Sequence, residues 1–408
     1  MTVIARRASS FRQGIVLGAV TSLCCAVTAC SGPSGSATSI AKMDPVELVV
    51  NVHSVKGVDQ ALEFEAFARN VGERTGGKIT FDLQYGAVLM PVESSLSGLS
   101  DGLADISLIV TSVSNELPRT NAIAGLLSDP DRKLPHTLLA GAAAMYETAV
   151  EDPDLRAEYE AQNVELLGGT AVSNDLFCTK PADSVSDLAG RRVRLAGEAW
   201  STQAASIGMV PVQIPLTEAY EALQRGVIDC VIAPMYLLEN RQLWDHAKWI
   251  IPGVFALNTS LVWGMNKNTF ESLPPEAQNI LREETATLFR TDISQILTDL
   301  SEVATLGPRE HGLQFDDPNK IRDVLASGSV ALRAASLKKL ADAGIADPEA
   351  FDTAFQERVA RWESSLVAAG LRTSDAANPD AVRDAYAALG NSTSVLNTWF
   401  DEIATQLR

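Results

Sequence analysis

In the first third of the chain, the pattern of hydrophobic and polar residues has a helical period in some stretches and a strand-like period in others. Residues 61–74 carry apolar side chains at nearly helical spacing, and Thr75-Gly76-Gly77 ends the helix. Strand-like stretches lie around it and after a second helix-like stretch at 92–103; they cover residues 47–53, 78–85 and 105–110. The order strand, helix, strand, helix, strand predicts a parallel α/β sheet.

The same order recurs in the middle of the chain. Strand-like stretches cover residues 192–195, 211–214 and 227–232, and helix-like stretches cover 200–207 and 217–225. Two such units predict two lobes.

Helical patterns dominate after residue 273. Residues 274–309 read as one long helix that begins at Pro274-Pro275 and ends at Gly307-Pro308. Such a helix would run about 50 Å, longer than one small domain, so we expect it to connect both lobes. Two ordinary helices with a break between them are the alternative. Residues 317–408 are expected to be mostly helical, including 329–343 and 348–369.

The N-terminus is typical of an export signal. Three arginines precede an uncharged run at 14–27, which is too short to cross about 30 Å of hydrocarbon. The run ends in Val27-Thr28-Ala29-Cys30, which resembles the bacterial lipobox and implies that Cys30 is lipidated and becomes the first residue. We expect a signal peptide at 1–29 and a flexible, Gly/Ser/Pro-rich tether within 30–45. An ordinary cleaved signal is the alternative.

Composition and charge narrow the function. The 408 residues are 46% apolar and can bury the cores of two domains. The formal charge is −18, and removal of three arginines with residues 1–29 makes it −21. This acidity argues against nucleic-acid binding and against electrostatic docking on an anionic membrane. No later stretch approaches eighteen consecutive apolar residues.

The chain carries few candidates for metal or cofactor chemistry. Its four histidines are scattered and its cysteines lack metal-site spacing, so we expect no metal. Neither a P-loop nor G-x-G-x-x-G is present, and we expect no cofactor. Outside the cytoplasm Cys178 and Cys230 could form a disulfide, or they could remain two separate buried thiols.

One motif suggests an enzyme. Gly98-Leu99-Ser100-Asp101-Gly102 matches G-x-S-x-G, the nucleophile elbow of hydrolases. That elbow needs a strand before it and a helix after it, whereas the order predicted here is the reverse. We therefore expect no enzyme, and an envelope lipoprotein hydrolase using Ser100 remains the weaker alternative.

The central segment resembles the solute-binding proteins of TRAP transporters, the C4-dicarboxylate-type or DctP-like family. Asp187 to Arg194 (DLAGRRVR) is similar to the family's DLkGlKiR stretch, and Gly208 to Cys230 is similar to the stretch that follows it. Further similarities lie at Glu73–Ile79, Gly102–Ile106 and around Met265–Pro274, in the family's order. The resemblance covers roughly residues 46–310.

The resemblance implies a two-lobe periplasmic-binding-protein fold, type II-like, with a cleft between the lobes. The implied function is capture of a small organic acid outside the cytoplasm and delivery to the small and large membrane subunits of an ion-gradient-driven permease. A ligand-sensing subunit of a signalling system is the alternative among binding proteins. The expected layout is lobe I at 46–171, lobe II at 172–258, a return to lobe I with the bridging helix at 259–310, and a helical region at 311–408 packed on lobe II or both lobes.

The resemblance also assigns Arg194 to the ligand carboxylate. A guanidinium offers a planar fork of donors that matches a carboxylate. Asn174 stands where sialic-acid-type members carry a second arginine, and Ala233 replaces an asparagine that helps to hold the ligand. These departures favour a monocarboxylate with an apolar body. Further candidates at strand ends or near Arg194 are His53, Ser54, Thr111, Ser112, Trp200, Leu216, Met235 and Tyr236.

Overall fold

A computed structural model describes residues 39–57, 60–114, 116–128, 134–371, 379–390 and 392–407. The expected signal peptide, Cys30 and most of the expected tether lie outside these ranges. Within them, no helix has both the length and the apolar character needed to cross a bilayer.

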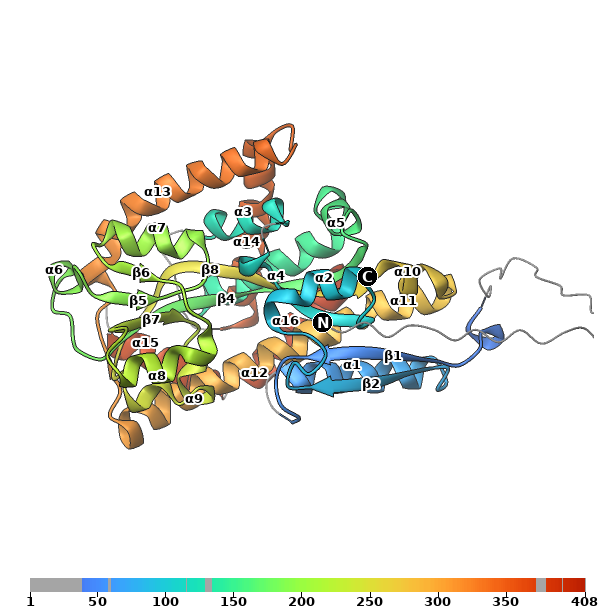
Figure 1. Cartoon of the computed structure of the whole chain (residues 1–408), viewed down its shortest axis with the longest axis horizontal. Coiled ribbons are helices and arrows are strands. Elements are labelled where there is room, and N and C mark those ends of the chain that lie inside the picture. The colour runs from blue at the N-terminus through green and yellow to red at the C-terminus, as the bar shows by residue number, and fades with distance from the viewer. Residues whose placement is uncertain are drawn as a thin grey trace, which may run out of the picture. The chain divides into compact units, whose positions relative to one another are not determined.

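The described strands form one mixed sheet of nine strands in the order β2-β1-β3-β8-β4-β7-β5-β6, with β9 paired to β8 (Figure 1). The strands are β1 (Val46–Val52), β2 (Ile79–Tyr85), β3 (Ile106–Val110), β4 (Val164–Cys178), β5 (Arg192–Arg194), β6 (Val210–Val212), β7 (Cys230–Ala233), β8 (Trp249–Asn266) and β9 (Gln314–Phe315). We call the parallel group β2, β1 and β3 with its helices lobe I, and the parallel group β7, β5 and β6 with its helices lobe II.

The parallel strands predicted within each lobe are confirmed, and two long strands that the sequence did not predict join the lobes by antiparallel pairing. β4 has 15 residues and β8 has 18, and they pair antiparallel with each other in the middle of the sheet. β8 is also antiparallel to β3 in lobe I, and β4 is antiparallel to β7 in lobe II. All of β4 is buried, so its sequence lacks the alternation that marks a half-exposed strand.

The β4–β8 pair changes register where it passes between the lobes. Shifts occur between Leu166 and Gly168 and at three steps between Thr170 and Leu176, after which the pairing is regular up to Cys178. Such irregularities bend and twist a strand. The expected boundary between the lobes at residues 171 and 172 therefore lies inside a continuous strand.

Short helices and 3-10 turns cover the lobes. In lobe I, the apolar face of α1 (Gln60–Arg74) buries Phe64, Phe67 and Val71. Because these residues recur at helical spacing, the sequence predicts this helix. The helices and 3-10 turns up to residue 272 are η1 (Ile40–Lys42), α1 (Gln60–Arg74), η2 (Val92–Ser94), α2 (Ser95–Ser100), η3 (Thr111–Val113), α3 (Pro118–Leu126), α4 (His136–Glu151), α5 (Pro153–Glu160), α6 (Val185–Leu188), α7 (Glu198–Ser206), η4 (Leu216–Glu218), α8 (Ala219–Gln224), α9 (Leu237–Asn240), η5 (Leu243–Asp245) and α10 (Lys267–Ser272).

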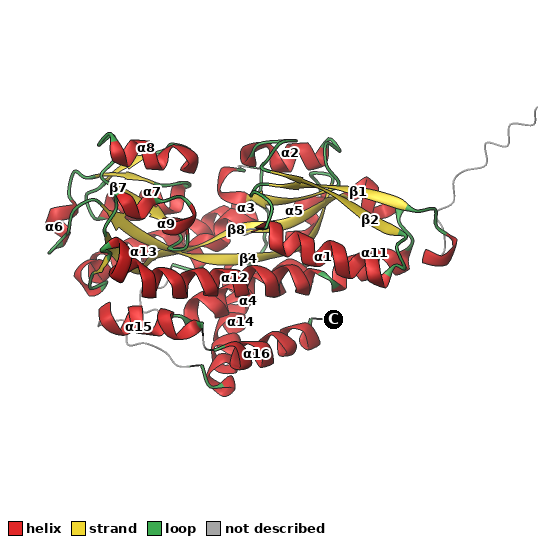
Figure 2. Ribbon diagram, turned by 90° about the horizontal axis from the view of Figure 1, so that it is seen from below, coloured by secondary structure: helices red, strands yellow, loops and turns green. Residues whose placement is uncertain are grey.

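The single helix expected at 274–309 is two helices, α11 (Pro275–Glu283) and α12 (Thr285–Leu306). The break falls at Glu284, whose carboxylate accepts hydrogen bonds from Arg74 at 2.9 Å and Asn70 at 3.0 Å on α1. α12 alone has 22 residues, about 33 Å. It contacts α1 of lobe I and α9 of lobe II, and it lies below the sheet in Figure 2.

The C-terminal region adds helices on two sides of the sheet. They are α13 (Asn319–Asp342), α14 (Pro348–Ala369), α15 (Pro379–Leu389) and α16 (Thr393–Gln406). α13 contacts α3 and α7, on the side away from α12 (Figure 1). α14 packs on α4 and α15 packs on α12, so these helices form an outer layer (Figure 2).

α13 joins the two lobes through tight contacts. Its Ile321 and Leu325 belong to the lobe II core that also contains Val193 and Trp200. On its other half, Ser336 lies so close to Gly125 of α3 that a Cβ at Gly125 would sit 1.9 Å from the Ser336 hydroxyl oxygen. Only glycine allows this approach.

Candidate functional site

Arg194 is a buried cation at the carboxyl end of β5. Its side chain is 7% exposed, and its Nε donates to the carbonyl oxygen of Ile214 at 3.1 Å. Burial lowers the pKa of its guanidinium to about 10, so the charge persists at neutral pH. Among the described residues no carboxylate forms an ion pair with it. Apart from the bond to Ile214, no hydrogen bond of the guanidinium to a described residue is present.

The two arginines beside Arg194 have other roles. Arg192 forms a two-pronged pair with Asp229, with Nε–Oδ2 and Nη2–Oδ1 distances of 3.1 Å. Arg191 is half-buried and donates to the carbonyl oxygens of Lys180 and Pro181. Arg194 is thus the one of the three arginines that the fold buries.

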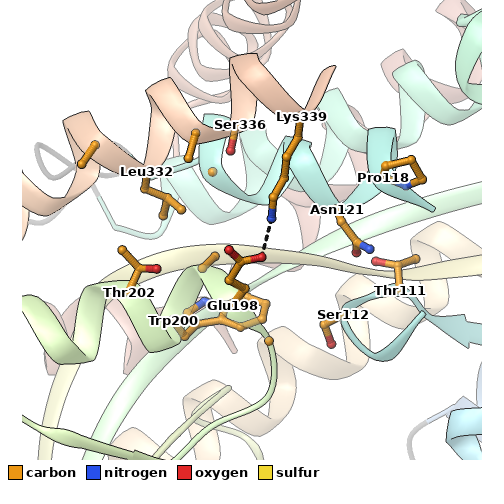
Figure 3. A pocket seen from close by; sticks show the side chains of 15 residues that line it. Thr111, Ser112, Pro118, Asn121, Glu198, Trp200, Thr202, Leu332, Ser336 and Lys339 are labelled. Carbon is orange, nitrogen blue, oxygen red and sulfur yellow. Dashed lines mark hydrogen bonds and ion pairs between the residues drawn. The ribbon is translucent and has the colours of Figure 1, made fainter. Parts of the chain in front are cut away.

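A cavity of about 340 Å³ lies between the lobes beside α13 (Figure 3). This volume is at the lower end of the range for small-molecule sites, roughly 300–1,000 Å³. Arg194 precedes Gly197, which lines the cavity, by three residues, so their Cα atoms are at most about 11 Å apart. The side chains that line the cavity come from η3, α3, α7 and α13: they are Thr111, Ser112, Pro118, Asn121, Glu198, Ala199, Trp200, Thr202, Ala331, Leu332, Ala335, Ser336 and Lys339.

Gly197 brings the two lobes into contact at the edge of this cavity. Its φ of +107° is a conformation that side chains disfavour. A Cβ there would lie 2.5 Å from the Trp200 ring and 3.5 Å from Cβ of Ser112 in lobe I. The glycine thus lets Trp200 fold over the start of α7 while η3 approaches from the other lobe.

Two hydroxyl groups in the cavity lack partners. The Oγ1 of Thr111 and the Oγ of Ser112 are buried, and neither forms a hydrogen bond with any described residue. Buried polar groups without a partner are uncommon in native proteins, because each costs about 1–3 kcal/mol. Both residues line the cavity, so their hydroxyls are candidates for hydrogen bonds to a ligand there.

The other expected site residues lie elsewhere in the fold. Arg194 itself is not among the residues that line this cavity, and neither are His53, Asn174, Leu216, Met235 and Tyr236. His53 follows β1, and its Nε2 lies 2.9 Å from the Ser95 hydroxyl. Asn174 is buried within the irregular part of β4, and Met235 is buried in the main core. Leu216 begins η4 and Tyr236 precedes α9; both are half-buried.

The structure also bears on the cysteines, metal chemistry and Ser100. Cys178 of β4 and Cys230 of β7 are joined by a disulfide in lobe II. In the described ranges no three His, Cys, Asp or Glu side chains gather as metal ligands. Ser100 ends α2 and β3 follows it, the reverse of the hydrolase order.

Sequence reasoning missed the contribution of α13 to the cavity. Ser336 and Lys339 come from a helix that begins more than 110 residues after α7 ends, and no local pattern indicates which face meets the cleft. Gly197 could have been found, because a glycine just after a strand end often permits close approach.

Comparison with known proteins gives the family. Residues 54–302 match the sequence model of DctP, bacterial extracellular solute-binding protein, family 7. A curated protein described as a solute-binding protein, from Albidiferax ferrireducens, is 23% identical over 230 residues, which cover 53% of this chain and 62% of that protein. The chain therefore spans less than two thirds of the length of this relative.

Three solved structures illustrate the likeness in fold. A TRAP solute-binding protein from Rhodoferax ferrireducens, in complex with benzoate, has a TM-score of 0.64 at 18% identity, covering 78% of this chain and 99% of its own. One from Bordetella bronchiseptica, with bound mandelate, has the same score and coverage at 22% identity. A Bordetella pertussis extracytoplasmic solute receptor that binds pyroglutamic acid has a TM-score of 0.62 at 18% identity, covering 77% and 99%. With the family match over more than half of its length, this chain belongs to family 7 of the bacterial extracellular solute-binding proteins.

Proposed function

We propose that the protein captures a small organic acid in the cleft between its lobes, with Arg194 as the anchor for the carboxylate. The observation that carries the proposal is a buried guanidinium without a carboxylate partner among the described residues. Leaving a buried charge without a partner is costly, so such a group is retained where a ligand supplies the opposite charge. A carboxylate matches the fork of guanidinium donors.

The cavity and the relatives support the size and class of the ligand. A volume of about 340 Å³ admits a small molecule. Trp200 and Leu332 offer apolar surface to its body, and the Thr111 and Ser112 hydroxyls offer hydrogen bonds. Benzoate, mandelate and pyroglutamate, which the three structurally similar proteins bind, each carry one carboxylate.

A thermal-shift screen of organic acids tests this proposal. A ligand that binds only the folded state raises the unfolding free energy by RT ln(1 + [L]/Kd), about 2.7 kcal/mol at a hundredfold excess over Kd. We expect small monocarboxylates to raise the melting temperature, and their uncharged amides not to, since the amides cannot pair with Arg194. Equal shifts for an acid and its amide would contradict the proposal.

We further propose that Cys30 carries a lipid anchor outside the cytoplasm and that the bound acid passes to the membrane subunits of a TRAP-type permease. The lipobox-like sequence before Cys30 and the family match support this. Cell fractionation tests the anchor: Cys30→Ser should move the protein from the membrane to the soluble fraction after export. Retention of that variant in the membrane fraction would contradict a lipid on Cys30. Co-purification of the wild-type protein with two membrane subunits tests the partner.

A further inference from the structure

The mouth of the cavity carries an ion pair that joins α7 to α13. The Glu198 Oε2 lies 2.6 Å from the Lys339 Nζ, and the dashed line in Figure 3 marks this contact. Glu198 is the first residue of α7 in lobe II, and Lys339 comes from the half of α13 that packs on α3. We call these two residues the rim pair.

The rim pair leaves the cavity without net charge. Of the described residues that line the cavity, Glu198 and Lys339 are the only charged ones. The neighbouring lysine of α13, Lys338, is paired with Asp342 at 2.5 Å and does not line the cavity. The residues that line the cavity therefore offer hydroxyl groups, the Asn121 amide, an indole ring and one lysine already paired with an acid; the nearby Arg194 is not among them.

We propose that Glu198 is a specificity-determining residue that makes this chain select acids with one carboxylate over acids with two. The inference rests on the proposed function, in which Arg194 binds the first carboxylate. A second carboxylate entering the cavity would need a cation of its own, because burying an unpaired charge is far more costly than burying a hydroxyl. The lysine that could serve is already neutralised, and the Glu198 carboxylate repels a second anion.

An uncharged hydrogen-bonding group, unlike a second carboxylate, should be favoured in this cavity. The buried hydroxyls of Thr111 and Ser112 have no partner among the described residues and could each bond to it. The ligand class that fits is thus a monocarboxylate whose body is apolar and carries one hydroxyl or carbonyl group.

Two matched sets of acids test the selectivity by isothermal titration calorimetry. One set is benzoate, 3-hydroxybenzoate and benzene-1,3-dicarboxylate; the other is butyrate, 4-hydroxybutyrate and succinate. Within a set only the group at the far end changes, from hydrogen to hydroxyl to carboxylate. We expect the hydroxy acid to bind most tightly and the dicarboxylate most weakly in any set that binds.

Glu198→Gln then tests the rim pair directly. The change frees Lys339, and it should raise the affinity for the dicarboxylate relative to the monocarboxylate about fivefold, as one partly exposed charge interaction allows. Asp342→Asn is the matched control, since it frees Lys338 on the same helix and adds the same charge away from the cavity. We expect the control to leave the ratio unchanged, and circular dichroism checks that both variants fold.

The outcomes separate this inference from the proposed function. Binding that depends on Arg194 but ranks the dicarboxylate first would overturn the inference alone. The same is true of Glu198→Gln and Asp342→Asn variants whose affinity ratios shift equally or not at all. If no acid of either set binds the wild-type protein, the proposed function is overturned and the inference falls with it.

Discussion

Two buried charges in this molecule are treated in opposite ways. Glu147 on α4 is 4% exposed, and it accepts hydrogen bonds from Trp362 Nε1 at 2.8 Å, Arg358 Nε at 3.2 Å and Arg361 on α14. Arg194 on β5 is 7% exposed, and one carbonyl oxygen is the partner that its guanidinium has among the described residues. The first charge is compensated within the fold and the second is not.

The difference indicates what each charge is for. A buried carboxylate surrounded by two guanidiniums and an indole holds α14 against α4 and needs nothing from outside. A buried guanidinium without an acid lowers the stability of the free protein, and its pKa falls to about 10 because burial penalises the charged form. Such a group gains its counter-charge when an acid binds.

The largest effect that we expect is the loss of affinity on changing Arg194. Arg194→Met leaves the ligand carboxylate without its cation, which costs on the order of 3–5 kcal/mol, or more than about a hundredfold in Kd. Calorimetry with the acid that gives the largest shift in the thermal screen measures it. Arg192→Met is the matched control on the same strand, and its affinity should be close to that of the wild type. Similar losses in both variants would remove the contrast between the two arginines.

Glu147→Gln should lower the stability of the protein and leave its ligand affinity nearly unchanged. The amide keeps the shape of the side chain but removes the charge that holds Arg358 and Arg361, and we expect the unfolding free energy to fall by about 2–3 kcal/mol. Ligand affinity should stay within about a factor of two of the wild type, since Glu147 lies outside the cavity. Urea denaturation measures the stability. Glu151→Gln, at the exposed end of the same helix, is the control. A loss of ligand affinity without a loss of stability would contradict the structural role of Glu147 in holding α14 against α4.

Gly197→Ala tests whether the close approach beside Arg194 matters. An added Cβ would meet the Trp200 ring at 2.5 Å and would adopt a φ of +107°. We expect a loss of about 2 kcal/mol in unfolding free energy, combining overpacking with backbone strain. Gly190→Ala separates the two causes, because Gly190 has a φ of +78° and no atom within 4 Å of its Cβ position. Equal losses would show that the Trp200 contact contributes nothing.

The sequence predicted the lobes better than the region between them. The lobe strands and helices have clear periods: α1 buries Phe64, Phe67 and Val71 at helical spacing, and short strands alternate with helices on both sides. β4 was missed because all 15 of its residues are buried and its pattern is neither helical nor alternating. The break in the long helix was only the alternative expectation, and its position at Glu284 could not be predicted, because Glu284 is bound by Arg74 and Asn70 of α1, more than 200 residues earlier.

The candidate site was partly predictable for the same reason. Arg194, Trp200 and Thr111 follow from a family-like motif and from strand ends, which are local features. Ser336 and Lys339 reach the cavity because α13 packs across both lobes, and that packing depends on Gly125, whose role appears only in three dimensions. The departure at Asn174 remains an expectation about the ligand.

The smallest effect that we expect is on the pH dependence of the unfolding free energy, through His53. His53 is a second basic group near a strand end, in lobe I, and it can be compared with Arg194 in lobe II. Burial lowers the pKa of His53 from 6.5 to about 4, with Glu93 acting in the opposite direction, so the imidazole is neutral at pH 7. Histidine thus escapes the cost of a buried charge by losing its proton, which a guanidinium does not do at this pH. The folded protein keeps its full stability with respect to this group above pH 6.5. It loses stability as the pH falls toward 4, because the His53 imidazole of the unfolded chain binds a proton at a higher pH than that of the folded chain.

His53→Gln removes this titration while keeping a polar group near Ser95. We expect the unfolding free energy of the wild type to fall by about 1 kcal/mol more than that of the variant between pH 6.5 and pH 5.5. Denaturation at a series of pH values measures the difference. The Arg194→Met variant should keep the wild-type slope over this range, since the Arg194 pKa of about 10 lies far above it. If the unfolding free energies of the wild type and His53→Gln changed equally with pH, the imidazole would be solvated. His53 would then differ from Arg194 in burial as well as in its ability to lose a proton.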